Sequence, residues 1–292
     1  MINIYEEVTN RILKQLEAGL IPWRKTWNTG LPKSLTTGKE YRGINILMLT
    51  ISGYSSHYWV TYRQTELLGG HVRRGEKSTT VIYWKWRTAE DFQKLRQKTG
   101  KEDFAPCVPF TSQVFNLDQV EGVAAPEDDQ PNRQNNRLET AEMMLEVMPS
   151  KPEIVLSSIT NPVYNRVLDR VTLPHLSQFV NADEYYGTLF HELAHSTGHA
   201  KRLNRFAAAE GDRTEKYSFE ELVAEFGSAF LCGFTGISNP ATNALQASYI
   251  DGWSQVFKKD SRIILRAASA AQRAADYIRG KLLMNEEHAV AA

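Results

Sequence analysis

The chain has 292 residues, of which 42% are apolar and 23% are charged, and its 34 basic side chains balance 34 acidic ones. These fractions are typical of a globular protein and exclude a disordered or fibrous chain. The longest apolar runs fall short of the roughly 18 residues that a membrane-spanning helix needs, and the acidic, helix-like start is unlike a signal peptide. Two distant cysteines, Cys107 and Cys232, favour reduced thiols. We therefore expect a cytoplasmic protein.

The balanced charge hides a difference between the two halves of the chain. Residues 1–120 hold 17 Lys and Arg against 11 Asp and Glu, whereas residues 121–292 hold 17 against 23. The excess is concentrated in residues 21–101, which contain 15 basic and 5 acidic side chains. Such a split indicates a polyanion as a partner of the first half.

The first half predicts a mixture of helices and strands. An apolar face of helical period ends at Gly19 and predicts a helix over residues 5–18. Further helices are predicted at residues 45–51 and 88–97, and strands at residues 81–86 and 108–115.

A polar segment divides the sequence. Residues 122–137 contain two prolines and show no apolar period, which predicts a linker between a domain of residues 1–121 and a domain of residues 138–292. In the second domain, helices are predicted at residues 138–148, 182–197, 218–232 and 247–279, the last broken near Lys259, and strands at residues 153–156 and 169–173. The predicted fold class is α+β.

One predicted helix of the second half carries the pattern His-Glu-x-x-His, at His191, Glu192 and His195. Residues four apart lie on one face of a helix, so the two imidazoles can bind one Zn²⁺, while Glu192 can deprotonate a water there. Asn181 and Glu184 form a capping box that supports the helix. The alternative is a pair of histidines that only pack or cap. The fitting helix and the strand before it favour the metal site.

A catalytic zinc needs a third protein ligand and one open position. Metzincins supply a histidine six residues after the second motif histidine, but that position is Lys201. The next helix offers Glu221 as ligand and Glu225, one turn on, as hydrogen-bond partner of a histidine ring, as in gluzincins such as thermolysin. Ser218 with Glu221 is also a capping box. Glu225 and then Glu220 are the substitute ligands.

These parts predict a zinc metallopeptidase. The strand over residues 169–173, expected at a sheet edge, is predicted to pair with an extended peptide. The residue that stabilises the oxyanion stays open among Tyr185, Tyr186 and His199. A structural zinc would need a fourth ligand, and a metal-dependent nuclease would need a carboxylate-rich site, so the three ligands with Glu192 favour the peptidase.

The basic half interleaves cations with aromatic rings, and five of its residues are tryptophans. Single-stranded nucleic acid is bound when cations follow the phosphates and rings stack on bases, so single-stranded DNA is the predicted partner, with weaker binding of double-stranded DNA. The alternative is a core of rings with a solvated charged rim. The candidate DNA-binding residues are Arg24, Lys25, Trp27, Lys39, Tyr41, Arg42, Asn45, Trp59, Arg73, Arg74 and Lys77.

Several motifs carry a wider resemblance. In the first half they are Pro22-Trp23, Lys39-x-Tyr41-Arg42-Gly43-Ile44-Asn45, Trp59-x-Thr61 and Gly69-Gly70-x-Val72-Arg73-x-Gly75-Glu76-Lys77. In the second half they are Tyr185-Tyr186, His191-Glu192-Leu193-Ala194-His195-Ser196-Thr197-Gly198-His199 and Ala275-Asp276-Tyr277. With them the chain resembles ArdC-type antirestriction proteins, whose N-terminal domain TraC-type conjugative primases share.

The resemblance implies a plasmid-encoded protein that binds single-stranded DNA and protects incoming DNA from host restriction during conjugation. It also implies a C-terminal zincin-like metallopeptidase domain of gluzincin type that binds Zn²⁺ or a similar ion such as Mn²⁺. The peptide substrate stays open, and a host protein bound to DNA is our hypothesis. The alternative is a non-catalytic protein that coats single strands and has a structural metal site.

Overall fold

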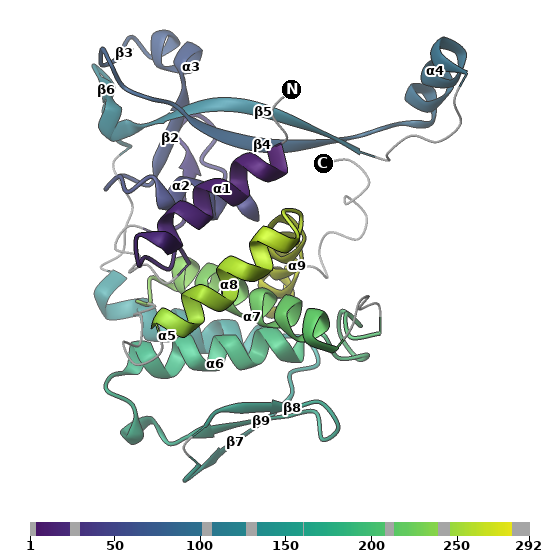
Figure 1. Ribbon diagram of the computed structural model, residues 1–292. Coiled ribbons are helices and arrows are strands. Elements are labelled where there is room, and N and C mark those ends of the chain that lie inside the picture. The colour runs from purple at the N-terminus through teal and green to yellow at the C-terminus, as the bar shows by residue number, and fades with distance from the viewer. Residues whose placement is uncertain are drawn as a thin grey trace. The chain divides into compact units, whose positions relative to one another are not determined.

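The computed structural model describes residues 4–23, 30–100, 107–126, 133–159, 161–207, 213–238 and 246–281 (Figure 1). The chain forms two compact units. The first, which we call the helical unit, consists of Met1–Pro32, Glu40–Ile51 and Glu127–Ala292, and the second, the strand unit, of Lys33–Lys39 and Ser52–Pro126. None of the helices in the described part of the chain is long and apolar enough to span a membrane.

The helical unit is built around one buried helix. Its described helices are α1 (Ile4–Glu17), α2 (Ile44–Ile51), α5 (Arg133–Val147), α6 (Ala182–Ser196), α7 (Arg213–Thr235), α8 (Gln246–Lys259) and α9 (Ile263–Ile278). Helix α7 packs against both α6 and α9, and its side chains from Leu222 to Cys232 are almost all buried. A helix that is apolar on every side is stable only inside a core, so α7 is the centre of this unit.

The N-terminal segments belong to the helical unit because their apolar groups find partners there. The Trp23 ring is fully buried and lies edge-on to Phe226 and Phe257, with centroids 5.0 and 6.2 Å away. On α1, the Thr9 hydroxyl donates to the Ser261 carbonyl oxygen over 3.0 Å. This division differs from the one predicted from the sequence, since residues 1–32 and 40–51 pack with the C-terminal helices.

The small sheet of the helical unit corrects one prediction. Its strands are ordered β7 (Glu153–Ser157), β9 (Arg170–Pro174) and β8 (Val163–Asn165), with β9 parallel to β7 and antiparallel to β8. The strand predicted at residues 169–173 is therefore central, and the prediction that it lies at an edge and pairs with a peptide is wrong. The short strand β8, which was not predicted, pairs with the second edge of β9. Within the described residues, the outer edges of β7 and β8 are the strand edges of this sheet to which an extended peptide could pair.

A buried arginine fastens the β8–β9 hairpin to the end of α6. The Arg202 side chain is fully buried and pairs with Asp169, while it donates to the Tyr164 hydroxyl over 3.0 Å and to the Ser196 carbonyl oxygen over 2.6 Å. Burial by itself would raise the pKa of the Asp169 carboxyl, but the hydrogen bonds from Arg202 and Tyr164 hold it well below its usual range. Just after α6, Gly198 allows the Phe206 ring to pack against the backbone, because a Cβ at this position would lie only 2.6 Å from that ring.

The strand unit is a twisted sheet with one long ribbon. Its main sheet is ordered β1 (Lys33–Ser34), β2 (Tyr58–Thr61), β5 (Cys107–Asn116) and β4 (Thr79–Trp86), and β3 (His71–Val72) pairs with β6 (Val120–Glu121). Strands β4 and β5 are antiparallel over their length and extend as a ribbon, beyond which lies α4 (Ala89–Thr99) (Figure 1). Helix α3 (Tyr62–Leu67) was not predicted; it is short and depends on a capping box between Thr61 and Gln64.

The α+β class and the other predicted helices and strands are confirmed, with boundaries shifted by a few residues. The break near Lys259 is also present, since α8 ends there. The predicted linker of residues 122–137 is too long, because α5 already begins at Arg133. Polar residues at the start of this helix carry no apolar period, so the sequence pattern could not reveal it. Residues 127–132 lie outside the described part.

Candidate metal centre

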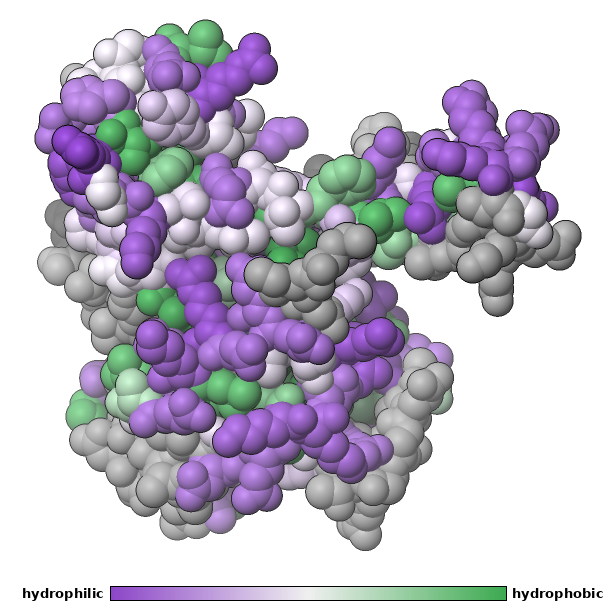
Figure 2. Space-filling model, turned by 45° about the horizontal axis from the view of Figure 1, so that its top comes forward, coloured by the Kyte–Doolittle hydropathy of each residue, from purple (hydrophilic) through white to green (hydrophobic). Residues whose placement is uncertain are grey.

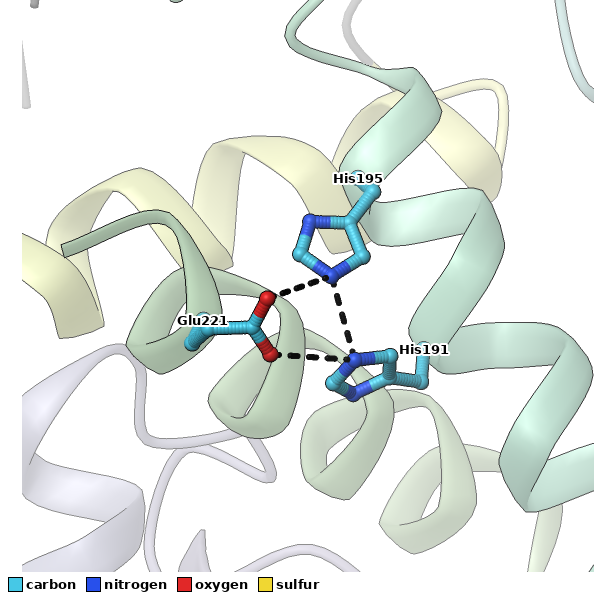
Figure 3. Close-up of side chains that lie close together, drawn as sticks. All are labelled: His191, His195 and Glu221. Atoms are coloured by element: carbon cyan, nitrogen blue, oxygen red, sulfur yellow. Dashed lines mark hydrogen bonds and ion pairs between the residues drawn. The ribbon is translucent and has the colours of Figure 1, made fainter. Parts of the chain in front are cut away.

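The two motif histidines share one face of α6. The helix begins at the predicted N-cap Asn181, whose side-chain oxygen accepts the backbone N–H of Glu184 over 2.9 Å. The predicted capping box is not completed, because the Glu184 carboxylate accepts the backbone N–H of Val180 over 3.0 Å instead. His191 and His195 follow one turn apart, and their Nε2 atoms are 3.1 Å from each other (Figure 3). Both rings therefore direct the same nitrogen toward one point.

A close contact between two helices brings the third predicted ligand to this point. A Cβ on Gly227 of α7 would be 3.0 Å from the Cβ of Ala194 on α6, and the Ser228 hydroxyl donates to the Gly187 carbonyl oxygen over 2.8 Å. The small residues thus let α7 lie close to α6. Figure 3 shows the Glu221 carboxylate facing both rings, with each oxygen 3.6 Å from one of the two Nε2 atoms.

The three side chains fit a divalent metal. A tetrahedral zinc with ligand bonds of about 2.1 Å holds its ligand atoms roughly 3.4 Å apart. Here the two Nε2 atoms are 3.1 Å apart, and each lies 3.6 Å from a different oxygen of the Glu221 carboxylate. Two imidazole nitrogens and one carboxylate also form the donor set of hydrolytic zinc sites. In the described residues, His191, His195 and Glu221 are the one cluster with this geometry.

The electrostatics of the site favour a cation. Burial disfavours a charged His191, but the hydrogen bond to Glu221 and the charges of Glu225, Glu192 and Glu221 outweigh it and raise the pKa of this imidazole. Burial likewise opposes the charge on Glu221, yet its hydrogen bond to His191 and the nearby His195 keep its pKa below the usual value. Carboxylates thus outnumber the cationic groups, and a bound ion would neutralise them.

A second glutamate orients one of the rings. The outer nitrogen of His195, Nδ1, lies 3.5 Å from Glu220, and Arg205 donates from Nε to the same carboxylate over 2.9 Å. Arg205 also donates to the Ala194 carbonyl oxygen over 3.1 Å, which ties this group to α6. The sequence predicted Glu225 as the partner of a ring nitrogen. The structure places Glu220 at His195, while the buried Glu225 acts on His191 through its charge.

Glu192, the predicted general base, is buried on α6 beside the two histidines. Its charge reaches His191 and also Tyr217. Tyr217 lies one turn before Glu221 on α7, and the Glu221 charge, burial and a hydrogen bond to Glu221 raise the pKa of its hydroxyl. Tyr217 was not predicted as a site residue, although its four-residue spacing from Glu221 places both side chains on one face of a helix.

The tyrosines and the histidine considered as oxyanion donors have other partners. The Tyr186 hydroxyl donates to Glu142 on α5, and Nδ1 of His199 faces Asp169 at 3.8 Å. The Tyr185 ring lies edge-on to Phe179. Tyr217 differs from them, since its hydroxyl forms a hydrogen bond with the predicted ligand Glu221.

The predicted DNA-binding residues divide into buried and exposed groups. Trp59 is 2% exposed with Tyr54 edge-on to it, and Asn45 is 6% exposed on α2. Both belong to cores, where they cannot stack on or bind a base. The Arg42 side chain pairs with buried Asp276, and the half-buried Tyr41 precedes it in the helical unit. Arg24, Lys25 and Trp27 lie outside the described residues.

The remaining predicted cations are on the surface of the strand unit. Lys39, Arg74 and Lys77 are exposed. Arg73 is exposed as well and donates to Glu76 over 2.8 Å. These four side chains keep their predicted role as candidates for phosphate contacts.

Two family models match the chain. The model of the N-terminal domain of anti-restriction factor ArdC matches residues 2–115, and the model of a zincin-like metallopeptidase matches residues 142–270. The second match contains the whole motif and Glu221. The resemblance inferred from the sequence is thereby confirmed.

Solved structures and curated proteins agree with these matches. The metal-free crystal structure of the antirestriction protein ArdC from plasmid R388 is similar over 97% of this chain and 99% of that one, with 35% identity and a TM-score of 0.74. The Mn(II)-bound crystal structure of ArdC from the same plasmid is similar over 96% of this chain and 98% of that one, with 34% identity and a TM-score of 0.72. Protein y4eC of Sinorhizobium fredii (strain NBRC 101917 / NGR234) is 32% identical over 94% of this chain and 91% of its own length.

A DNA primase TraC of Escherichia coli is 35% identical over 94% of this chain, and a second TraC is 34% identical over the same share. The chain spans only 27% and 20% of the lengths of these primases. The prediction of a divalent cofactor, zinc or an ion such as Mn²⁺, is confirmed for the family by the zincin-like match and by the Mn(II)-bound relative.

Proposed function

Because this chain belongs to the ArdC family of antirestriction proteins, we propose that it binds single-stranded DNA, hydrolyses a peptide bond at a divalent-metal site, and thereby protects incoming DNA during conjugation. The observation that carries the proposal is the convergence of His191, His195 and Glu221 beside Glu192. A three-ligand site with a neighbouring base suits catalysis, since a structural zinc is held by four protein ligands.

The residues of the site have distinct tasks. His191, His195 and Glu221 would hold the ion, which when bound polarises a carbonyl and lowers the pKa of water. Glu220, itself fixed by Arg205, keeps the His195 ring in its orientation. Glu192 accepts a proton from the attacking water at its carboxylate and delivers it to the leaving amine. The Tyr217 hydroxyl is placed to donate a hydrogen bond beside these groups.

Single-stranded DNA is the proposed partner of the strand unit. The exposed cations Lys39, Arg73, Arg74 and Lys77 supply phosphate contacts, and the relatives act in antirestriction or are named as primases. Binding to double-stranded DNA should be weaker because its base faces are hidden. These steps take place in the cytoplasm, where a DNA-bound host protein is the proposed peptidase substrate.

The test is plasmid transfer into a restricting host that expresses wild type or the variant Glu192→Gln. We expect the variant to keep its metal content and its DNA affinity but to lose protection, because a general base contributes about 10²- to 10⁴-fold to a hydrolytic rate. Glu146→Gln, at an exposed position on α5, is the matched control and should protect fully. Full protection by Glu192→Gln would instead support a non-catalytic protein that coats single strands.

A further inference from the structure

The outer half of the β4–β5 ribbon exposes large aromatic rings. Tyr83, Trp84, Trp86 and Phe110 are 48%, 37%, 57% and 53% exposed, whereas the inner residues Val81 and Ile82 are buried. Figure 2 shows apolar patches along this projecting part of the strand unit, with hydrophilic groups gathered around α4. An isolated two-stranded ribbon gains little from rings in water, so such a patch marks an interaction site.

The strand register sorts these residues onto two faces. Tyr83 pairs with Phe110 and Lys85 pairs with Val108, whereas Trp84 and Trp86 pair with Pro109 and Cys107. Since successive side chains of a strand point to opposite faces, Tyr83, Lys85, Val108 and Phe110 share one face of the ribbon. The two tryptophans lie on the other face.

A cavity of about 310 Å³ lies between the first face and α4. The ribbon contributes Lys85, Arg87, Val108 and Phe110, and α4 contributes Asp91, Lys94, Leu95 and Lys98. The spacing of the α4 residues places them on one side of the helix. Four cations and one carboxylate therefore surround an apolar floor that includes an aromatic ring.

Among the described residues, the acidic groups near the cavity do not cancel its positive charge. The Asp91 carboxylate accepts the Thr88 backbone N–H over 2.9 Å as part of the α4 capping box, which also lowers its pKa. Lys94 pairs with Glu90 at 2.7 Å, but both side chains are about 70% exposed. An exposed pair of this kind is weak and is readily exchanged for a phosphate contact. The cavity thus suits an anion that also carries a flat ring.

We propose that this cavity binds single-stranded DNA, with a base stacked on Phe110 and the flanking phosphates bound by Lys85, Arg87, Lys94 and Lys98. Double-stranded DNA hides its base faces, and a free phosphate would leave the rings unused, so a single strand accounts for both features. The inference rests on the proposed function, and none of the DNA-binding residues predicted from the sequence lines the cavity.

The experiment titrates the full chain against a fluorescent oligo-dT of about 15 nucleotides and follows anisotropy at several salt concentrations. Phe110→Ala should weaken binding about 5- to 150-fold, the loss expected for one stacked base. The double variant Lys94→Gln/Lys98→Gln should reduce the slope of log affinity against log salt by about 1.4.

Matched controls lie away from the cavity. Leu67→Ala removes an exposed apolar side chain from α3, and Lys14→Gln/Lys151→Gln removes two exposed lysines from the helical unit. Both should bind like wild type, and melting curves should show that every variant is folded. If wild type binds the oligonucleotide and the cavity variants bind equally well, the cavity assignment is wrong while the proposed function stands. If wild type does not bind it at all, both are overturned.

Discussion

The charged side chains of the candidate metal centre in the helical unit are mostly buried, whereas those around the cavity of the strand unit are mostly exposed. Around the candidate metal centre, the side chains of His195, Glu220 and Arg205 are 14%, 16% and 10% exposed, and each is held by partners. On the ribbon and α4, Lys94 is 70% exposed and Lys98 is also on the surface. A hydrolytic site needs fixed atoms, whereas a polyanion of variable shape is bound well by cations that can move. The molecule therefore combines a preorganised site with an adaptable one.

The largest expected difference between the units concerns stability. Arg202→Met removes the buried cation of Asp169 and leaves that carboxylate with only the exposed Lys201, 3.3 Å away, so it should lower the free energy of unfolding by about 3–5 kcal/mol. Lys98→Met on exposed α4 is the matched change and should cost less than about 0.5 kcal/mol. Urea unfolding measures the free energy of unfolding of each variant. A similar decrease for Arg202→Met and Lys98→Met would contradict the proposed difference between the two units.

The pH range of this effect follows from the depressed pKa of Asp169. A group whose pKa is lower in the folded state contributes stability above its unfolded pKa, near 3.9, and loses it as the pH falls toward the folded value. The cost of Arg202→Met should therefore be the same at neutral pH and at about pH 5.

A smaller effect is expected at the ring partner of His195. Glu220→Gln should weaken metal binding about 10- to 100-fold, because the ring loses a charged acceptor that fixes its orientation. Competition with a chromophoric chelator measures this change, and DNA affinity should stay constant. Glu146→Gln is the control for loss of a surface charge. An unchanged metal affinity in Glu220→Gln would show that His195 is oriented without Glu220.

The smallest expected effect concerns the pH dependence of stability, which should have opposite signs in the metal-free and the metal-loaded protein. The pKa of His191 is raised in the folded state, so this group stabilises the metal-free protein fully below about pH 6.5 and loses that contribution as the pH rises through the raised value. A bound ion needs the neutral imidazole, so the metal-loaded protein should gain stability over the same rise. Thermal melts between about pH 6 and pH 8, with chelator or with Mn²⁺, measure the two slopes. Equal slopes would contradict the idea.

The sequence predicted best where one helix supplies its own geometry. His191, Glu192 and His195 lie on a single helix, so their spacing alone predicted their common face. Glu221 required a second helix, and thermolysin-like spacing still led to it. The position of Glu220 at the His195 ring depends on how α7 is rotated against α6, where Gly227 permits a close contact, and no local pattern encodes that rotation.

Features that depend on distant pairing were harder to predict. The position of β9 in its sheet is decided by β8, a strand of three residues with no detectable alternation. Trp59 was predicted to contact DNA, yet its neighbours Tyr54 and strand β5 enclose it. The cavity under α4 escaped the sequence analysis altogether, because its lining comes from two strands and a helix that meet only through the register of the ribbon.

The path of the chain between the units limits how this protein can be divided. It leaves the helical unit after Pro32, returns at Glu40, leaves again after Ile51 and returns at Glu127. A fragment cut at the polar segment would carry α1, α2 and Trp23 away from the helices that bury them, and would expose an apolar surface liable to aggregate. A recombination event that transfers only part of this region would separate segments that fold together, so we expect the two units to be exchanged between genes only as a whole. The similarity to the much longer TraC proteins, which covers 94% of this chain and therefore both units, is consistent with this expectation.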